Sequence, residues 1–253
     1  MTASCSRGSG LCDGNAPQLS ESQRASRHVW SLSGPARGAT GGALPMSPLY
    51  RRALLAGAPL LLPAVARGQT LLTATPAQTE GPFYPASLPA DFDNDLVQVR
   101  GQAARAMGTV LHLEGRVLDR AGRPVPGVTV EIWQCDAQGI YDHPRDSRRE
   151  QRDGAFQGFG RVQVEADARY RFRTLSPVAY PGRAPHIHVA VLSGSARLVS
   201  QFYLAGHPRN DRDRIFRAAT SVPGGRERIE MRPQDAPGLE AGALAATLHI
   251  VLG

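Results

Sequence analysis

Short segments with β-strand patterning constrain the fold of this chain more than any other feature. Residues 110–118 alternate between apolar and polar side chains, and residues 128–133 are rich in β-branched and aromatic residues. The intervening residues 119–127 are dense in Gly, Pro and Asp, which is typical of a turn. The same signals predict further strands at 156–164, 170–174, 187–192, 198–204, 226–231 and 245–252.

Helical periodicity is weak throughout the chain. Only residues 210–217 predict a brief helix, with Asn210 or Asp211 as its N-cap. No segment has a helical period long enough for the crossover of a parallel βαβ unit. Short strands spaced about ten residues apart therefore predict an all-β fold, an antiparallel β-sandwich whose loops and short helices carry any functional site.

The N-terminal third has a different character. Residues 1–45 are rich in Gly, Ser, Ala and Arg without an apolar period, so we interpret them as a disordered or non-native extension, with Met46 as the true start. Residues 46–66 combine a basic start, a short apolar run and an Ala64-Val65-Ala66 cleavage pattern, which indicates a signal peptide and export to the periplasm or medium. The run is too short to span a bilayer. The Arg51-Arg52 pair favours the twin-arginine route, with the general secretory route as the alternative.

Residues 67–108 are expected to form an N-terminal arm with loops, and residues 109–253 the β-sandwich domain that carries any functional site. Residues 67–253 hold 23 Arg against 20 Asp and Glu, so the net charge falls from +7 for the whole chain to +3. Basic residues are not clustered, which argues against a nucleic-acid partner. Cys135 is the only cysteine after the leader, which excludes an internal disulfide and predicts a small buried side chain.

Two histidines in one strand indicate a metal site. His186 and His188 are two residues apart, so their imidazoles point to the same face of the strand. Tyr180 and Arg183 lie just upstream in a turn rich in Pro and Gly. We interpret this stretch as the wall of a metal site; the alternative is a surface strand whose histidines are incidental.

Other polar and aromatic segments have simpler interpretations. Residues 79–85 (Thr-Glu-Gly-Pro-Phe-Tyr-Pro) either line a pocket or pack the arm across a sheet. The aspartates at 91, 93 and 95 lack the glycine and distal glutamate of a calcium loop, so a solvated acidic loop is expected. His143 is expected to be an exposed loop histidine, whereas Trp133 and Phe172 are expected in the core.

Several motifs in chain order resemble the intradiol ring-cleavage dioxygenases, the group of protocatechuate 3,4-dioxygenase. The resemblance runs from about residue 79 to residue 213 and includes a Gly-Asp-Gly-Pro-Val-x-Gly core that prealbumin-like binding sandwiches share. The more specific motifs are Val130-Glu-Ile-Trp-Gln134, Asp136-x2-Gly-x-Tyr141, Phe156-x-Gly-Phe-Gly-Arg161, Tyr180-Pro-Gly-Arg183, Pro185-His-Ile-His188 and Gln201-x-Tyr203.

The resemblance implies a mononuclear non-haem Fe(III) ion bound by Tyr141, Tyr180, His186 and His188. It implies that O2 cleaves a catechol-type substrate between its two hydroxyl-bearing carbons to give a cis,cis-muconate-type product. Phenolate is a hard anionic donor that suits a ferric ion, because ligand type rather than raw affinity selects the metal.

The resemblance also implies roles for catalytic residues. Tyr180 would be the exchangeable ligand that acts as a base for a catechol hydroxyl. Arg183 would stabilise charge that develops on the substrate, and Gln201 would lie beside its ring. The alternatives are that Arg183 serves a structural ion pair and that Gln201 bonds only to backbone.

Two departures qualify the resemblance. The spacing from Tyr180 to His186 is shorter than in the archetypal protocatechuate enzymes, so the rim of the site and its substrate differ. The chain also lacks the long N-terminal helical region of the catechol-cleaving branch.

The alternative function is a secreted β-sandwich binding module without turnover.

Overall fold

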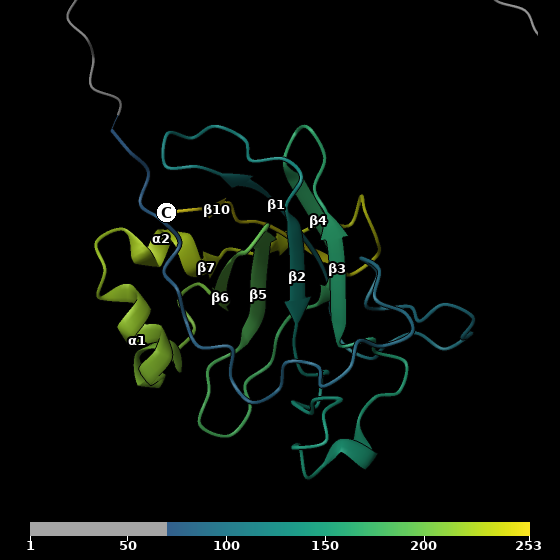
Figure 1. The fold of residues 1–253 in the computed structure, drawn as a ribbon. Coiled ribbons are helices and arrows are strands. Elements are labelled where there is room, and N and C mark those ends of the chain that lie inside the picture. Colours follow the sequence, from purple (N-terminus) through teal and green to yellow (C-terminus); the bar gives the residue numbers. More distant parts are fainter. Residues whose placement is uncertain (1–69) are drawn as a thin grey trace, which may run out of the picture. The chain divides into compact units, whose positions relative to one another are not determined.

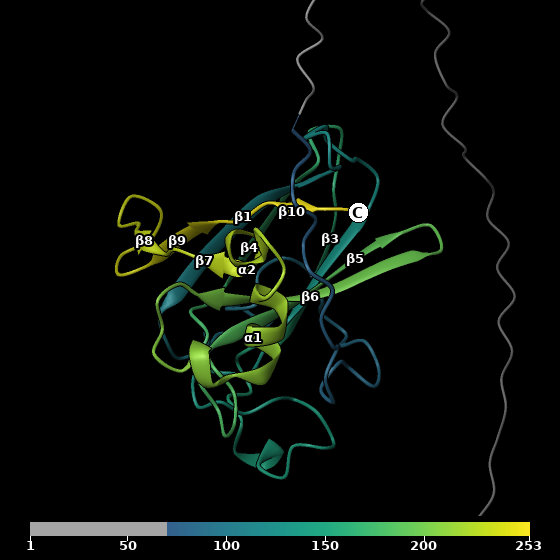
Figure 2. The ribbon, with the colours of Figure 1, turned by 90° about the vertical axis from the view of Figure 1, so that its left-hand side faces the viewer.

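The computed structural model describes residues 70–253. The extension expected at 1–45 and the signal peptide expected at 46–66 lie outside the described residues. None of the helices between residues 70 and 253 is long and apolar enough to cross a membrane. The described residues form two five-stranded sheets (Figures 1 and 2).

The first sheet is built around its longest strand. That strand, β1 (Val110–Leu118), pairs antiparallel with β4 (Arg169–Leu175). On its other side β1 pairs parallel with two short strands, β9 (Leu244–Thr247) and β10 (Ile250–Val251). The two-residue strand β8 (Gln234–Asp235) extends the sheet beyond β9.

The second sheet carries most of the predicted strands. Its order is β3 (Phe159–Gln163), β2 (Thr129–Trp133), β5 (His186–Ser193), β6 (Ala196–Leu204) and β7 (Glu230–Met231). The first four strands pair antiparallel, but β7 pairs parallel with β6. The predicted all-β sandwich is confirmed: most strand pairs are antiparallel, and the short strands β7, β9 and β10 add parallel pairs. The chain leaves β6 through a helical connection and therefore returns to the sheet edge in the same direction.

Short helices occupy that connection. The 3₁₀ turn η2 (Asn210–Arg212) leads into α1 (Arg214–Thr220), and α2 (Gly225–Ile229) precedes β7. The predicted brief helix is thus present, but its cap is Asp213 rather than Asn210 or Asp211. The predicted strand at 226–231 was wrong for residues 226–229, which belong to α2, whereas its last two residues form β7. Another 3₁₀ turn, η1 (Arg149–Gln151), lies in the long loop after β2.

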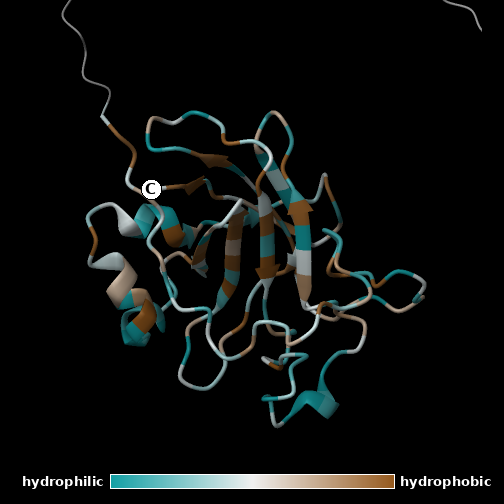
Figure 3. Cartoon of the chain, in the orientation of Figure 1, coloured by the Kyte–Doolittle hydropathy of each residue, from teal (hydrophilic) through white to brown (hydrophobic). Residues whose placement is uncertain are grey.

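Side chains of the second sheet alternate between a face that packs in the core and a face that is turned away from it. Ile132 on β2 and Ile187 and Val189 on β5 pack against the first sheet in the main hydrophobic core. Figure 3 shows this alternation as bands of hydrophobic and hydrophilic residues along the strands. Trp133 and Phe172 are both buried, as expected, but Trp133 belongs to a separate aromatic cluster on the opposite face.

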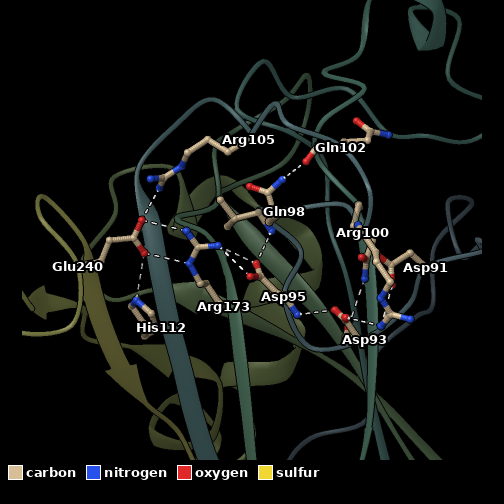
Figure 4. A network of polar contacts seen from close by, with 12 residues as sticks. Asp91, Asp93, Asp95, Gln98, Arg100, Gln102, Arg105, His112, Arg173 and Glu240 are labelled. Carbon is tan, nitrogen blue, oxygen red and sulfur yellow. Dashed lines mark hydrogen bonds and ion pairs between the residues drawn. The ribbon is translucent and has the colours of Figure 1, made fainter.

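The acidic loop at 91–95 is held by ion pairs (Figure 4), while the side chains of Asp93 and Asp95 stay 39% and 37% exposed, as expected for a solvated loop. Asp95 pairs with Arg173 on β4 at 2.9 Å, and Asp93 pairs with Arg100 at 3.1 Å. Arg173 also pairs with Glu240 at 2.9 Å. Arg173 therefore joins the arm, the first sheet and the turn before β9, regions far apart in the sequence.

Candidate metal centre

Strand register places the two histidines beside the other functional residues of the second sheet. On β5, His188 lies between Trp133 of β2 and Gln201 of β6, and His186 pairs with Tyr203 of β6. Directly paired side chains project from the same face of a sheet. All five side chains therefore lie on the face that is turned away from the main core.

The four predicted ligands meet on this face. Tyr141 comes from the loop after β2, and Tyr180 comes from the turn before β5. Ring centroids are 5.6 Å apart for Tyr141 and Tyr180, 5.4 Å for Tyr180 and His186, and 4.8 Å for His186 and His188. Tyr141 is 3% exposed and each histidine 1% exposed, whereas Tyr180 is only half-buried.

The loop that delivers Tyr141 is fixed by one carboxylate. Asp136 Oδ1 accepts hydrogen bonds from the amides of Gln138 (2.8 Å) and Ile140 (2.9 Å), while Oδ2 accepts one from the amide of Asp153 (2.8 Å). Gly139 supplies the positive φ of +76° that the tight turn requires. These contacts explain the Asp136-x2-Gly139-x-Tyr141 spacing of the sequence.

Both imidazoles are held neutral. His186 Nδ1 lies 2.7 Å from the Ala184 carbonyl oxygen, which assigns the proton to Nδ1 and leaves the lone pair on Nε2. Burial, with the nearby Arg183 charge, lowers the pKa of His186 to about 3. Burial also holds the pKa of His188 well below its ordinary value. The two Nε2 atoms lie 3.2 Å apart, and the His188 ring stacks on Trp133 at 4.7 Å.

The two phenols fit a bound cation. Burial raises the pKa of Tyr141 well above 10 and raises that of Tyr180, the latter against the opposing charge of Arg183. Tyr141 Oη is buried and has no hydrogen-bond partner within the described residues. A buried polar atom without a partner is costly, and a multiply charged metal would both satisfy it and hold it as phenolate.

The donor set suits a hard metal. Within residues 70–253, no cluster of three or more His, Cys, Asp or Glu side chains is placed to hold a metal ion. A site with four donors therefore needs the two phenols in addition to the two imidazoles. Two anionic oxygens and two neutral nitrogens match a small, highly charged ion.

Arg183 connects this donor set to an adjacent polar network. Its Nη1 is 3.3 Å from Tyr180 Oη, and its Nε donates to Asp213 at 2.8 Å. Its Nη2 donates to Gln201 Oε1 at 2.5 Å and to Tyr203 Oη at 3.2 Å. Arg183 thus makes a structural ion pair and also points at a ligand. Gln201 likewise bonds to backbone, at the Thr79 carbonyl oxygen (2.9 Å), as well as accepting from Arg183.

Sequence reasoning missed three residues of this network. Tyr203 was noticed only as part of a motif, and Asp213 and Gln78 were not singled out. Gln78 Oε1 accepts from Tyr203 Oη at 3.1 Å, and Gln78 Nε2 donates to Ser200 Oγ at 3.0 Å. The signal for Asp213 was its place in the run Asn-Asp-Arg-Asp, where a cap was expected but assigned to the wrong residue.

The N-terminal arm satisfies both interpretations offered for residues 79–85. Phe83 stacks on Tyr141 at 4.4 Å, so the arm lines the site. Tyr84 donates to the fully buried Glu131 at 3.0 Å, so the arm also packs across the sheet. The expectation of an exposed His143 was wrong, because its ring is buried edge-on against Phe83 at 5.7 Å.

Two cavities flank the four ligands. One of about 780 Å³ lies between the arm, the Tyr180–Arg183 turn and α1, and Arg183 forms part of its wall. The other, of about 360 Å³, is bordered by Phe83, Trp133 and Tyr141. Of the four predicted ligands, only Tyr141 lines either of these two cavities.

A family model described as Dioxygenase matches residues 79–230, the span that contains the four predicted ligands, Arg183 and Gln201. The chain belongs to the intradiol ring-cleavage dioxygenase family. The protocatechuate 3,4-dioxygenase beta chain of Burkholderia cepacia is 35% identical over 180 residues, covering 68% of this chain and 76% of that protein. Hydroxyquinol 1,2-dioxygenase of Rhodococcus opacus is 31% identical over 182 residues, covering 61% of this chain but only 57% of that protein.

Solved structures of the family share the fold. The dioxygenase domain of a dioxygenase carbohydrate-binding protein fusion from Streptomyces sp. SirexAA-E aligns with a TM-score of 0.55 and 30% identity, over 71% of this chain and 98% of that one. Catechol 1,2-dioxygenase from Acinetobacter sp. ADP1 aligns with a TM-score of 0.55 and 25% identity, over 71% of this chain and 62% of that one. These intradiol dioxygenases are ring-cleaving oxidoreductases, and the two-sheet architecture of this chain agrees with theirs.

Proposed function

We propose that this chain is a mononuclear non-haem Fe(III) dioxygenase that opens the ring of a catechol-type substrate between its two hydroxyl-bearing carbons. Both atoms of O2 enter the product, a cis,cis-muconate-type diacid. The observation that carries the proposal is the convergence of a buried phenol, a half-buried phenol and two neutral imidazoles. Tyr141, Tyr180, His186 and His188 would hold the ion.

The bound ferric ion would make the catechol ring reactive toward O2. Tyr180 is the ligand suited to exchange, because it is half-buried and sits on a turn, whereas Tyr141 is enclosed beneath Phe83. When substrate arrives, Tyr180 Oη accepts the proton of a catechol hydroxyl, and the protonated phenol lies beside Arg183 Nη1 at 3.3 Å.

Arg183 would stabilise charge on the substrate, and Gln201 would present its amide to the substrate in a fixed orientation. The guanidinium of Arg183 is permanently charged and is fixed by Asp213, Gln201 and Tyr203. A fixed cation beside the ring stabilises negative charge as it develops on the substrate, without reorganisation at the moment of reaction. Gln201 is anchored to the Thr79 carbonyl oxygen, so its amide is held in one orientation.

The metal proposal is tested by colour and iron content. Phenolate-to-iron charge transfer should give the purified protein a visible absorption band, together with about one iron per chain. Replacing Tyr141 or Tyr180 with Phe should shift or abolish the band. Tyr170→Phe is the matched control, because Tyr170 is equally buried but bonds to the Leu248 carbonyl oxygen in the core. An unchanged band in both ligand variants would refute the ligand assignment.

Turnover separates the enzyme from a binding module. O2 uptake with catechol, and appearance of the ring-opened diacid, are expected from the iron-loaded protein. A secreted binding module that keeps the scaffold without turnover is the alternative. A colourless preparation that stays inactive after iron reconstitution would favour that alternative and reject the enzyme.

We also propose that the chain is exported, with substrates encountered outside the cytoplasm. The support is the sequence pattern at 46–66, a basic start followed by an apolar run and Ala64-Val65-Ala66. Intact-mass analysis of the protein from the periplasm or medium should show a chain that begins after residue 66. A mature chain that retains residues 1–45 would contradict both the export signal and the start at Met46.

A further inference from the structure

The two predicted histidine ligands differ in how their second ring nitrogen is held. His186 Nδ1 lies 2.7 Å from the Ala184 carbonyl oxygen, whereas His188 Nδ1 is buried and has no hydrogen-bond partner within residues 70–253. Metal-binding histidines usually donate this N–H to a carboxylate, a carbonyl or a water, which fixes the orientation of the ring. The orientation of His188 must therefore come from another contact.

Trp133 supplies a contact of the required kind. Its ring stacks on His188 with the centroids 4.7 Å apart and an angle of 10° between the ring planes. Trp133 Nε1 is itself buried and has no hydrogen-bond partner within the described part of the chain. No polar contact therefore fixes the indole, and its orientation depends on the rings and backbone that pack against it.

Tyr84 of the N-terminal arm packs against the indole. The two ring centroids are 5.0 Å apart and the planes meet at 88°, which is the favourable edge-to-face arrangement of two aromatic rings. The arm also lies close to His188 itself, because a Cβ placed on Gly81 would be 3.4 Å from His188 Cε1. The arm thus contacts both rings of the stack.

Tyr84 is held at its hydroxyl group and over its ring. Its Oη donates to Glu131 Oε2 at 3.0 Å, and the fully buried Glu131 is held in turn by Arg161 Nε at 2.9 Å. A hydrogen bond to a carboxylate is stronger than one between neutral groups. The Arg197 guanidinium lies 5.0 Å from the centroid of the Tyr84 ring, within the range of a cation–π contact. Tyr84 is therefore a fixed support for the indole.

We propose that Tyr84 is a positioning residue for His188. Anchored on Glu131, it holds Trp133 in the stack that orients the His188 imidazole, and this stack replaces the hydrogen bond that orients His186. The proposal rests on the iron site proposed above and adds a residue outside the ligand set. Tyr84 is not a ligand and acts through Trp133.

Iron affinity tests the proposal with a pair of variants on the same arm. Tyr84→Phe keeps the ring and removes the bond to Glu131. Thr75→Val is the matched control, because the buried Thr75 Oγ1 accepts from the Val251 amide at 2.9 Å, on a strand of the first sheet. Both variants should lose similar stability, but only Tyr84→Phe should raise the Kd for iron, about tenfold, as when a partner of a metal-binding histidine is lost. Equal Kd values in the two variants would overturn the proposal.

The indole of Trp133 gives a readout that needs no iron. The chain has two tryptophans, Trp30 and Trp133, so Trp133 is the only one in a Trp30→Phe background. In NMR spectra of the iron-free protein, its indole N–H should give one sharp peak in the parent and in Thr75→Val. In Tyr84→Phe the peak should broaden or split, because the indole is less firmly held. A peak as sharp as that of the parent would count against the positioning role.

A double-mutant cycle shows whether Tyr84 acts through Trp133. Tyr84→Leu removes the ring edge and should weaken iron binding more than Tyr84→Phe does. This effect should nearly disappear in a Trp133→Leu background, because the stack is already lost there. Additive losses in the double variant would refute action through Trp133. If the parent protein binds no iron, the proposed function is rejected, and the indole spectra still decide whether Tyr84 holds Trp133.

Discussion

Asp213 is the residue whose replacement most directly tests how Arg183 is held. Its Oδ2 accepts from Arg183 Nε (2.8 Å) and the Ala184 amide (3.0 Å), and its Oδ1 accepts from the amides of Ile215 (2.9 Å) and Phe216 (3.2 Å). All four partners are donors. An asparagine carries one NH2 group in place of an oxygen, so whichever way its amide turns, two bonds are lost and a donor faces donors.

The structure gives the magnitude of the effect for Asp213→Asn. Turning the amide toward Arg183 loses a charge-assisted bond worth about 1.5–3 kcal/mol. Turning it toward α1 loses part of the N-cap, worth about 0.5–2 kcal/mol. The amide orientation that loses less free energy still removes the negative charge beside Arg183. We expect a loss of about 2 kcal/mol in unfolding free energy, or roughly 4–8 °C in Tm for a domain of this size.

The functional consequence follows from the loss of Arg183 positioning. Without the carboxylate, the guanidinium keeps only its contacts with Gln201, Tyr203 and Tyr180. We therefore expect kcat for catechol to fall about tenfold, equivalent to about 1.4 kcal/mol of transition-state stabilisation. KM should change less, since Asp213 does not touch the ring. Asp211→Asn is the matched control, because that carboxylate is 85% exposed two residues away. Equal Tm and kcat in the two variants would refute the reasoning.

The pH dependence of stability adds an independent readout. Burial alone raises the pKa of Asp213, but the Ala184 amide and Arg183 outweigh it and lower the pKa below its ordinary value. A lowered pKa means that the carboxylate stabilises the fold above about pH 4 and that this contribution is lost as the pH falls further. The acid limb of Tm against pH should therefore be shallower in Asp213→Asn than in the parent protein.

Three further predictions concern the surroundings of the site. Tyr84→Phe keeps the ring but removes the bond to the buried Glu131, so chemical denaturation should show a loss of about 1–2 kcal/mol; an unchanged midpoint would contradict this. Glu240→Gln should flatten the Tm profile below about pH 4, because the bond to Arg173 lowers the pKa of Glu240 to about 2, and stability from a lowered pKa is lost on acidification. Cys135 should resist iodoacetamide at pH 8 until the protein unfolds, since burial raises its pKa to about 12, and rapid labelling of native protein would oppose that view.

The sequence was sufficient for most of the sheet and for bringing the four predicted ligands to one face. Period-two alternation placed His186 and His188 on one face, and β5 with its register to β6 confirms it. The chain order of motifs added Tyr141 and Tyr180, which the structure brings beside the two histidines. The histidine inference used side-chain direction along a strand, which neighbouring residues determine, whereas the two tyrosines came from the family resemblance.

The errors occurred where tertiary contacts decide between local alternatives. The run at 210–213 offers several helix caps, and only the contact with Arg183 selects Asp213. His143 is polar and lies in a loop, but Phe83, sixty residues earlier, covers it. The segment at 226–231 has alternating charges that suit an exposed strand, yet Ile229 packs with Tyr203 and Phe216, which favours α2. Such contacts join residues far apart in the chain and leave no local pattern.

Gly139 provides a test of whether loop geometry determines the position of Tyr180. Its φ is +76°, and a Cβ there would lie 3.3 Å from Tyr180 Cβ. Gly127 has nearly the same φ, +75°, but a Cβ there would meet nothing within 4 Å. Alanine at either position takes on left-handed strain of about 1–2 kcal/mol, so the two variants should lose similar stability.

The two glycine variants should differ in the site, because only Gly139→Ala crowds Tyr180. That contact is tighter than ordinary van der Waals packing, so Tyr180 must shift by a few tenths of an ångström. A small displacement of Tyr180 changes its orbital overlap with the metal and its exchange with substrate. The visible band should therefore move and kcat should fall in Gly139→Ala. In Gly127→Ala, both the band and kcat should stay as in the parent protein. If Gly139→Ala keeps the parent band and rate despite its lost stability, the loop holds Tyr141 alone, and the position of Tyr180 is determined by its own turn and Arg183.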